Sequence, residues 1–367
     1  MYKGHPTNVT SPPTPSQATK DAWARWALVA QQHGIPTMPQ LVHPGRQSPV
    51  ATGDRGFFAK AIAPSAIRMK LGPGTLDWLL SKVLFGTPRE MTFNDIDEVV
   101  SQFANAAKLA HDSGFKGVQI HAAHGFLLTQ FLSPTSNKRS DAYGGTPTKR
   151  ARIVLEVIRA VRAAVPPSFC VGIKVNSADV GGAESLEESL HQIGLIANEA
   201  IDFIEISGGT MENLRMAKGD SPSSPQAPVK SERTLHREAF FLDYARAVRA
   251  QYPDILLMLT GGFRSRRGMQ DALDSGACDI VGLGRPAAVW PRLPKEVLLN
   301  KEVKDEDAMA ELGFVKPTGL LAWVPIKLVG AGPDVVSGTL LWTSLGWRPW
   351  LMMWADVLCG SDLETRG

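Results

Sequence analysis

Residues 117–145, GVQIHAAHGFLLTQFLSPTSNKRSDAYGG, decide the fold of this chain, because they place two histidines directly after a short apolar run. The run 117–121 predicts a buried strand, so His121 and His124 lie where a strand passes into a loop. Catalytic side chains of α/β proteins commonly occupy that position. The stretch therefore predicts an α/β fold with chemistry at the carboxyl end of a strand.

Outward from this stretch, strand and helix signals alternate along the chain. The expected strands cover residues 37–42, 117–121, 169–175, 202–207, 255–260 and 279–283, and the expected helices cover residues 20–33, 92–113, 148–164, 185–200, 238–251 and 265–275. Irregular loops are expected over 44–89 and 208–234. Strands that alternate with helices, without a run of hairpins, predict one parallel sheet with right-handed crossovers.

Two architectures fit this order, a doubly wound sheet and an eight-stranded barrel. The doubly wound dinucleotide-binding fold requires Gly-x-Gly-x-x-Gly after its first strand, and the motif does not occur there. A barrel is favoured by Thr260-Gly261-Gly262 and Gly282-Leu283-Gly284-Arg285, which end the last two expected strands, where barrels often bind phosphate. Either glycine pair alone is equally well a tight turn, whereas the two together indicate a phosphate site.

Composition excludes several classes of protein. The 367 residues are 44% hydrophobic and 20% charged, and 39 basic against 36 acidic residues give a net charge of +3 without a long run of either sign. No nucleic-acid partner is expected from that balance. Cys170, Cys278 and Cys359 are too far apart for a Cys-x-x-Cys motif or a disulfide framework. A reducing compartment, the cytoplasm, is expected.

The two ends differ from the middle in composition. Residues 1–19 are rich in Pro, Ser and Thr and lack the apolar core of a secretory signal, so they predict a disordered lead-in to a barrel over 20–298. Residues 299–367 form a Trp-rich apolar tail that charged residues interrupt before it reaches the roughly 18 apolar residues of a membrane span. No transmembrane segment is expected. The tail is expected to pack on the barrel or in a homo-oligomer interface.

Five ordered motifs together resemble the old yellow enzyme family of FMN-dependent ene reductases, over residues 20–298. The motifs are residues 117–145, QLVHPGR at 40–46, VGIK at 171–174 and the two glycine turns. The resemblance implies a TIM barrel that holds FMN at its C-terminal mouth. It also implies an enzyme in which NADPH or NADH reduces the flavin and an enone-type substrate, an α,β-unsaturated carbonyl compound, reoxidises it, with secondary metabolism as one setting.

The resemblance also implies roles for single residues. His121 and His124 would hydrogen-bond the carbonyl oxygen of the enone, and two donors aimed at a developing enolate stabilise charge that appears only in the transition state. Gln40 would hydrogen-bond the flavin ring, and Lys174 would stabilise the negative charge of reduced flavin. The FMN phosphate would be bound by Gly261, Gly262, Gly284 and Arg285.

A His-x-x-His pair also has a metal-binding interpretation. Zinc needs further ligands, and neither a nearby cysteine nor the glutamate of His-Glu-x-x-His is present in residues 117–145. Distant carboxylates remain an alternative source of ligands. No metal is expected.

The chain departs from the family pattern at Phe126, where many members carry a tyrosine that protonates the substrate. A phenyl ring cannot donate a proton. Water or another acid then protonates the product, or the reaction is an isomerisation or an oxidation linked to oxygen. Phe126 is in each case expected to form part of the substrate pocket wall.

The second departure is that only six of the eight barrel strands are recognisable, because the strand at Gln40 corresponds to the third strand of the family barrel. An incomplete barrel leaves unpaired strand edges. The alternative function is therefore a truncated, non-catalytic barrel remnant, or a subunit without stable flavin binding. The larger dienoyl-CoA reductase relatives, which carry an iron–sulfur cluster, are excluded because the chain has too few cysteines.

Overall fold

The computed structural model describes residues 15–51, 55–72, 74–178, 185–210, 212 and 230–310, and of residues 230–240 and 285 it describes the backbone alone. All structural statements below concern these residues. Residues 1–14 of the expected lead-in 1–19 and residues 311–367 of the expected tail 299–367, with its tryptophans, lie outside them.

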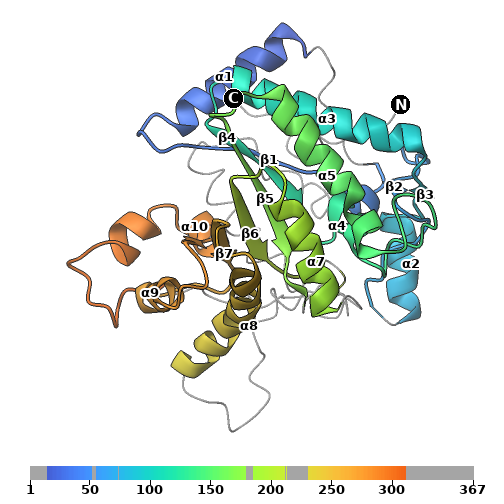
Figure 1. Ribbon diagram of the computed structural model, residues 1–367. Helices are drawn as coiled ribbons and strands as arrows, with labels where there is room; N and C mark the ends of the chain where they lie inside the picture. Colours follow the sequence, from blue (N-terminus) through green and yellow to red (C-terminus); the bar gives the residue numbers. More distant parts are fainter. Residues whose placement is uncertain are drawn as a thin grey trace, which may run out of the picture.

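A six-stranded parallel sheet forms the centre of the molecule (Figure 1). Its strands, in spatial order, are β1 (Gln40–Leu41), β4 (Gly117–Ala122), β5 (Cys170–Asn176), β6 (Phe203–Ser207), β7 (Leu257–Thr260) and β8 (Ile280–Gly282). Every neighbouring pair is parallel. All six predicted strands are confirmed, and β1 and β8 are the edges of the sheet in the described part of the chain.

Helices connect the strands and cover one face of the sheet. They are α1 (Gln17–Ala30), α3 (Phe93–Asp112), α5 (Pro147–Ala164), α7 (Leu186–Ala197), α8 (Lys230–Gln251) and α9 (Arg266–Asp274), with a short α4 (Leu127–Leu132) directly after β4 and a short α10 (Arg285–Val289) after β8. Helices α3, α5 and α7 pack side by side along the sheet (Figure 1). Their first turns are capped by the hydroxyls of Thr92, Thr146 and Ser185, each of which accepts a backbone N–H three residues later.

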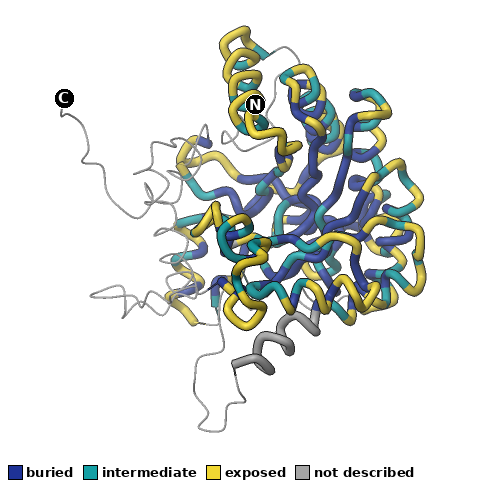
Figure 2. The backbone as a smooth tube through the Cα atoms, turned by 90° about the vertical axis from the view of Figure 1, so that its left-hand side faces the viewer, coloured by how far each residue is buried: buried dark blue, intermediate teal, exposed yellow. Residues whose placement is uncertain are grey.

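The face under these helices, which we call the helix face, is apolar throughout. Its strand residues are at most 2% exposed: Val118, Ile120, Ala122, Val171, Ile173, Val175, Ile204, Ile206, Leu257 and Leu259. They form one core with buried side chains of α3 and α5 such as Phe103 and Ile158. The continuous dark band in Figure 2 marks this burial.

The opposite face, which we call the polar face, carries the alternate residues of the same strands. The strand register brings together Gln40, Gln119, His121, Lys174, Asn176, Glu205, Ser207, Met258 and Thr260. Successive strand residues point to opposite faces, so one set of strands supplies both surfaces. The inner face of a parallel barrel is arranged in the same way.

Residues 44–89, expected as an irregular loop, contain regular structure. They form a 3₁₀ turn η1 (Gly45–Gln47), a two-stranded parallel ribbon of β2 (Ile62–Ala63) with β3 (Arg89–Glu90), and helix α2 (Thr75–Leu84). The expectation was wrong because strands of two residues carry no periodicity and because α2 begins after Gly74 without a Ser or Thr cap.

Two helix boundaries also differ from the expectation. Helix α1 begins at Gln17, inside the expected lead-in, because the hydroxyl of Ser16 caps it. Helix α8 begins at Lys230, eight residues before the expected start at 238. A π-helical turn η2 (Pro294–Leu298) then leads the chain back to α9, where Arg266 donates to the carbonyl oxygens of Val297 and Leu298.

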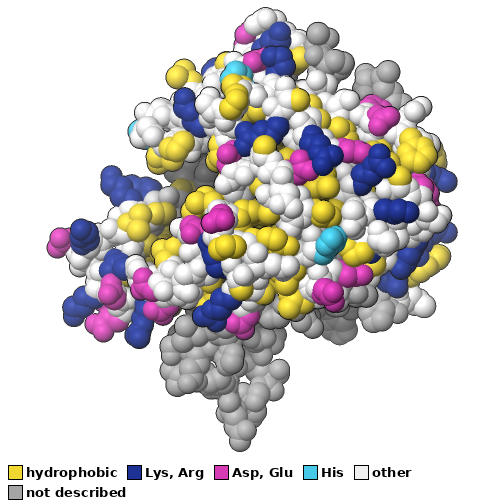
Figure 3. Space-filling model, in the orientation of Figure 1, with side chains coloured by type: hydrophobic (Ala, Val, Ile, Leu, Met, Phe, Trp, Pro, Cys, Tyr) yellow, Lys and Arg dark blue, Asp and Glu magenta, His cyan; other side chains and the backbone are white. Residues whose placement is uncertain are grey.

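The surface mixes both signs of charge, as Figure 3 shows for one side of the molecule. Exposed ion pairs such as Arg159 with Glu199, 2.5 Å apart, link neighbouring helices. No helix in the described ranges is both long and apolar enough to cross a membrane.

Candidate functional site

The two histidines of the sequence motif lie together at the carboxyl end of β4. His121 is the last residue of β4 on the polar face, and His124 follows in the loop, with ring centroids 5.0 Å apart. His124 has a φ of +57°, a conformation that costs energy for a residue other than glycine. It is held by its N–H, which donates to Asn176 Oδ1 at 2.9 Å, and by its carbonyl, which accepts from Gln47 Nε2 at 2.8 Å. Strain at a strand end, fixed from two other segments, is typical of a functional site.

Burial keeps both imidazoles uncharged. It lowers the pKa of His121 well below the usual value, with smaller contributions from the positive charges of His124 and Lys174. Burial, and then Lys174, lower the pKa of His124 to about 4. At neutral pH each ring is therefore one donor and one acceptor.

The hydrogen bonds of these rings indicate where their protons lie. Ala123 donates its backbone N–H to His121 Nδ1 at 3.1 Å, so the proton of neutral His121 is on Nε2. His124 Nε2 lies 3.1 Å from Ser207 Oγ on β6. His121 thus presents an N–H group beside the polar face without carrying positive charge, and His124 is held by Ser207.

A chain of polar contacts crosses the polar face below the histidines. Gln40 Nε2 donates to Gln119 Oε1 at 2.5 Å, and Gln119 Nε2 donates to Glu205 Oε2 at 2.6 Å. Glu205 Oε1 lies 3.0 Å from Lys174 Nζ. Gln40 and Lys174, the two residues expected at the flavin ring, are therefore joined through two residues that the sequence analysis did not select.

The two glycine turns lie side by side, because Thr260 of β7 pairs with Gly282 of β8. Gly261 and Gly262 have φ values of +154° and +81°, which glycine adopts readily. Nothing lies within 4 Å of a Cβ built on Gly284. The side chain of Arg285 lies outside the described residues, so its expected phosphate contact is not placed.

These features fit a flavin nucleotide. The hydroxyl oxygen of Thr260 is buried between the two turns and has no hydrogen-bond partner among the described residues. A buried hydroxyl normally has a partner, which an oxygen-rich ligand can supply. The backbone at Gly284 has open space for a phosphate, and the amide and ammonium groups of Gln40 and Lys174 match the polar edge of a flavin ring.

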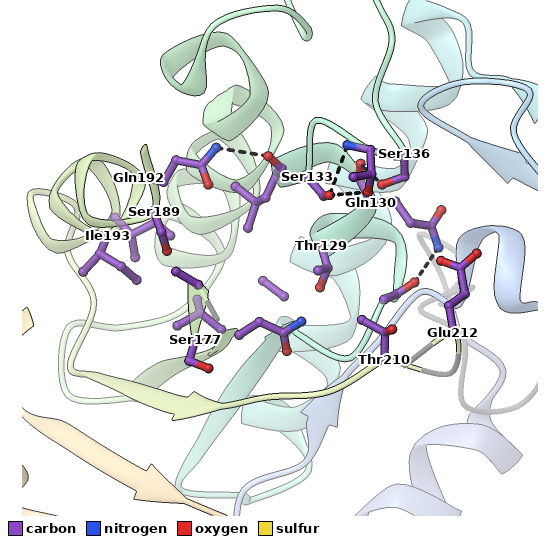
Figure 4. Close-up of a pocket in the computed structure, with 18 of the residues that line it drawn as sticks. Thr129, Gln130, Ser133, Ser136, Ser177, Ser189, Gln192, Ile193, Thr210 and Glu212 are labelled. Carbon is purple, nitrogen blue, oxygen red and sulfur yellow. Dashed lines mark hydrogen bonds between the residues drawn. The ribbon is translucent and has the colours of Figure 1, made fainter. Parts of the chain in front are cut away.

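A separate hollow lies between α4, α7 and the end of β5 (Figure 4). Its labelled lining side chains include Thr129, Ser133, Ser177 and Gln192, which come from those elements. Neither His121 nor His124 lines it. Ala122 and Gly125, the chain neighbours of the two histidines, do line it, so the hollow adjoins the histidine loop although the imidazole rings do not line it.

Phe126 packs edge-on against His121, with ring centroids 4.7 Å apart, and precedes the first turn of α4. No tyrosine replaces it in the described ranges. Tyr143 donates to Glu156 at 2.9 Å, and burial raises its pKa to about 12. The hydroxyls of Tyr244 and Tyr252 bond to Ser189 and to the carbonyl of Leu190.

Sequence reasoning missed Gln119, Asn176, Glu205 and Ser207. The run 117–121 predicts a buried strand and 202–207 a further strand, and a single polar residue within a strand carries little weight, while Asn176 lies just beyond the expected strand 169–175. Period-two alternation was the available signal, because Gln119 and His121 are two residues apart, as are Glu205 and Ser207, and each pair therefore lies on one face of its strand. Only the strand register shows that the two pairs lie on the same face of the sheet.

Comparisons with known proteins identify the family. The model of the NADH:flavin oxidoreductase / NADH oxidase family matches residues 23–304. The NADH-dependent flavin oxidoreductase iliE of Hypocrea jecorina is 45% identical over 316 residues, which cover 86% of this chain and 78% of that protein. The protein of the same name from Neonectria sp. is 50% identical over 295 residues, 80% of this chain and 38% of its own length. The chain therefore spans well under half of that second relative.

Solved structures agree on the fold. Morphinone reductase matches with a TM-score of 0.60 at 22% identity, covering 87% of this chain and 78% of its own. A 2-naphthoyl-CoA reductase matches with a TM-score of 0.65 at 21% identity, covering 84% of this chain and 45% of its own. The expected barrel class is confirmed. The chain belongs to the NADH:flavin oxidoreductase / NADH oxidase family, the family of the old yellow enzymes.

Proposed function

We propose that this protein is an FMN-dependent oxidoreductase that takes electrons from NADH or NADPH and reduces the activated C=C bond of an α,β-unsaturated carbonyl compound. FMN with NADH or NADPH is the cofactor set of the family. The observation that carries the proposal is the pair of neutral histidines beside the polar face, of which His121 is buried and His124 is partly buried.

The histidines act as hydrogen-bond donors to the substrate carbonyl oxygen. A fixed donor stabilises negative charge that develops on that oxygen as the C=C bond accepts hydride. Burial strengthens this interaction, because few water molecules compete for the oxygen. His121 donates from Nε2, and the hydroxyl of Ser207 orients the ring of His124.

The polar face and the glycine turns form the flavin site. Gln40 and Lys174 would bind the ring, and Gly261, Gly262 and Gly284, with the hydroxyl of Thr260, would bind the phosphate end. Bound FMN, once reduced, supplies the hydride for the substrate β-carbon. Lys174 stabilises the negative charge of the reduced ring.

Water supplies the proton for the neighbouring carbon. Phe126 has no proton to give, and the three described tyrosines are bonded elsewhere. An isomerisation, in which no net reduction takes place, would need no external proton and is the alternative outcome at the same site.

The test is reoxidation of NADH-reduced, FMN-loaded protein by 2-cyclohexenone under anaerobic conditions. Rapid return of the flavin absorbance is expected. His121→Ala should slow that step by about 10²- to 10³-fold, the usual effect of losing one donor to an oxyanion. The exposed His33, in the turn after α1, gives the control variant His33→Ala, which should leave the rate unchanged. A reduced flavin that the enone does not reoxidise would contradict the proposal.

A further inference from the structure

We propose that Glu205 is a positioning residue that sets both the orientation of Gln40 and the charge balance of Lys174 at the flavin ring. This inference rests on the proposed function, because it assigns a task to a residue beneath the proposed flavin site. Glu205 lies in the middle of β6, within the apolar sequence FIEIS, and is 3% exposed. A carboxylate buried to this degree is costly unless both its oxygens are paired.

Both oxygens of Glu205 are engaged, by side chains of the two strands that precede β6 in the sheet order. Oε2 accepts from Gln119 of β4, and Oε1 pairs with Lys174 of β5. Glu205 is thus the branch point between the two residues expected at the flavin ring.

The first branch fixes the orientation of two amides. An ionised carboxylate only accepts hydrogen bonds, so the NH₂ group of Gln119 must face Glu205. The carbonyl oxygen of Gln119 then faces Gln40 and accepts from its NH₂ group at 2.5 Å. The charge of Glu205 therefore determines, through Gln119, which edge Gln40 presents to a ligand.

The second branch sets the local charge. Lys174 lies beside His121 in the sheet register and lowers the pKa of both His121 and His124 through its positive charge. With Glu205 the ammonium forms a neutral pair. Without Glu205, an uncompensated positive charge would remain and would favour the reduced flavin, which is more negative than the oxidised form.

The two branches predict different effects for different variants. Glu205→Gln should raise the reduction potential of bound FMN by at least about 30 mV, the two-electron equivalent of a tenfold gain in affinity for reduced over oxidised flavin. Gln119→Met keeps the Lys174–Glu205 pair, so it should leave the potential unchanged while weakening FMN binding about tenfold. Glu205→Asp keeps the charge and should behave more like the parent protein than Glu205→Gln does.

The decisive experiment measures the potential of the FMN-loaded protein by dye-coupled titration in four proteins: wild type, Glu205→Gln, Lys174→Met and the double variant. If Glu205 acts through Lys174, Glu205→Gln raises the potential in the wild-type background and has no effect in the Lys174→Met background. The double variant removes both charges, which folding tolerates better than removal of one. Glu156→Gln, which removes a partly buried carboxylate of α5 that pairs with Arg152 and Tyr143, is the control for loss of a carboxylate elsewhere and should leave the potential unchanged.

A purely structural role for Glu205 would weaken oxidised and reduced flavin equally. The proposal that Glu205 balances the charge of Lys174 would be overturned if Glu205→Gln left the reduction potential unchanged or lowered it. It would also be overturned if the potential shifted equally in the wild-type and Lys174→Met backgrounds. Unchanged FMN affinity in Gln119→Met would overturn the proposal that Glu205 orients Gln40 through Gln119. This variant remains informative if Glu205→Gln does not fold. If wild-type protein binds no FMN, the proposed function fails instead, so the two failures are distinguishable.

Discussion

The helix face and the polar face of the central sheet are built from the same strands and differ in almost every physical property. Leu259 and Thr260 are adjacent on β7, yet Leu259 is fully buried in the core while the hydroxyl of Thr260 has no partner in the part of the chain that the structure describes. Likewise Ile173 packs under the helices, whereas its neighbour Lys174 is paired with Glu205 across the other face.

The difference shows how stability and function are separated along one strand. Burial of the helix face stabilises the fold, at roughly 25 cal/mol for each Å² of apolar surface removed from water. The polar face lowers the stability of the fold, because its charged and amide groups are removed from water and their hydrogen bonds and ion pairs offset only part of that cost. Alternation with period two keeps the two tasks on different residues.

The largest expected effect is on the helix face. Leu259→Ala should lower the free energy of unfolding by about 2 to 5 kcal/mol, because it removes buried methyl groups and leaves a cavity. Urea denaturation followed by circular dichroism measures this. If folded Leu259→Ala bound FMN more weakly than the wild type, the claim that the helix face serves stability alone would be contradicted.

Acidification should lower the free energy of unfolding by about 3 kcal/mol through the buried His43. His43 follows β1, is 2% exposed, and burial lowers its pKa to about 4. Between pH 6.5 and pH 4 the unfolded chain binds a proton that the folded chain does not, so stability falls as the pH falls. His43→Asn keeps an acceptor for the N–H of Gly45 and should remove about 3 kcal/mol of that loss between pH 7 and pH 4. His33→Asn, at an exposed position, should leave the pH dependence of unfolding as it is in the wild type, and an unaltered slope in His43→Asn would count against a buried neutral His43.

The smallest expected effect on stability is on the polar face. Thr260→Val replaces an unpartnered buried hydroxyl by a methyl group, which should change the free energy of unfolding by less than about 0.5 kcal/mol or raise it slightly. The same denaturation experiment serves as the measurement. A decrease of more than about 1 kcal/mol in the free energy of unfolding would mean that the hydroxyl has a structural partner in the protein and is not free to bind a ligand.

The sequence was sufficient to predict the frame of the fold. The six strands and the main helices follow from hydrophobic periodicity and from caps such as Thr146-Pro147, and the two glycine turns do lie at neighbouring strand ends. The small ribbon of β2 and β3 could not be predicted, since two-residue strands depend on tertiary contacts, here including Arg139, which donates to the carbonyls of Pro64 and Met91.

The site was predicted only in part. His121, His124, Gln40 and Lys174 were selected individually, and the structure places them around one face. Glu205 was not selected, because a single acid in an apolar strand has no local signal, and its importance comes from register with Lys174 and from contact with Gln119. Pairing between distant strands carries information that no single stretch of sequence contains.

The central claim is that the polar face binds the flavin while the helix face stabilises the fold. It is tested most directly on the adjacent residues Leu259 and Thr260. The measurement is the dissociation constant of FMN, from quenching of flavin fluorescence, for wild type, Leu259→Ala and Thr260→Val under conditions where all three are folded. The account predicts unchanged affinity in Leu259→Ala and affinity reduced about tenfold in Thr260→Val. Equal affinities in all three proteins, or a loss confined to Leu259→Ala, would contradict it.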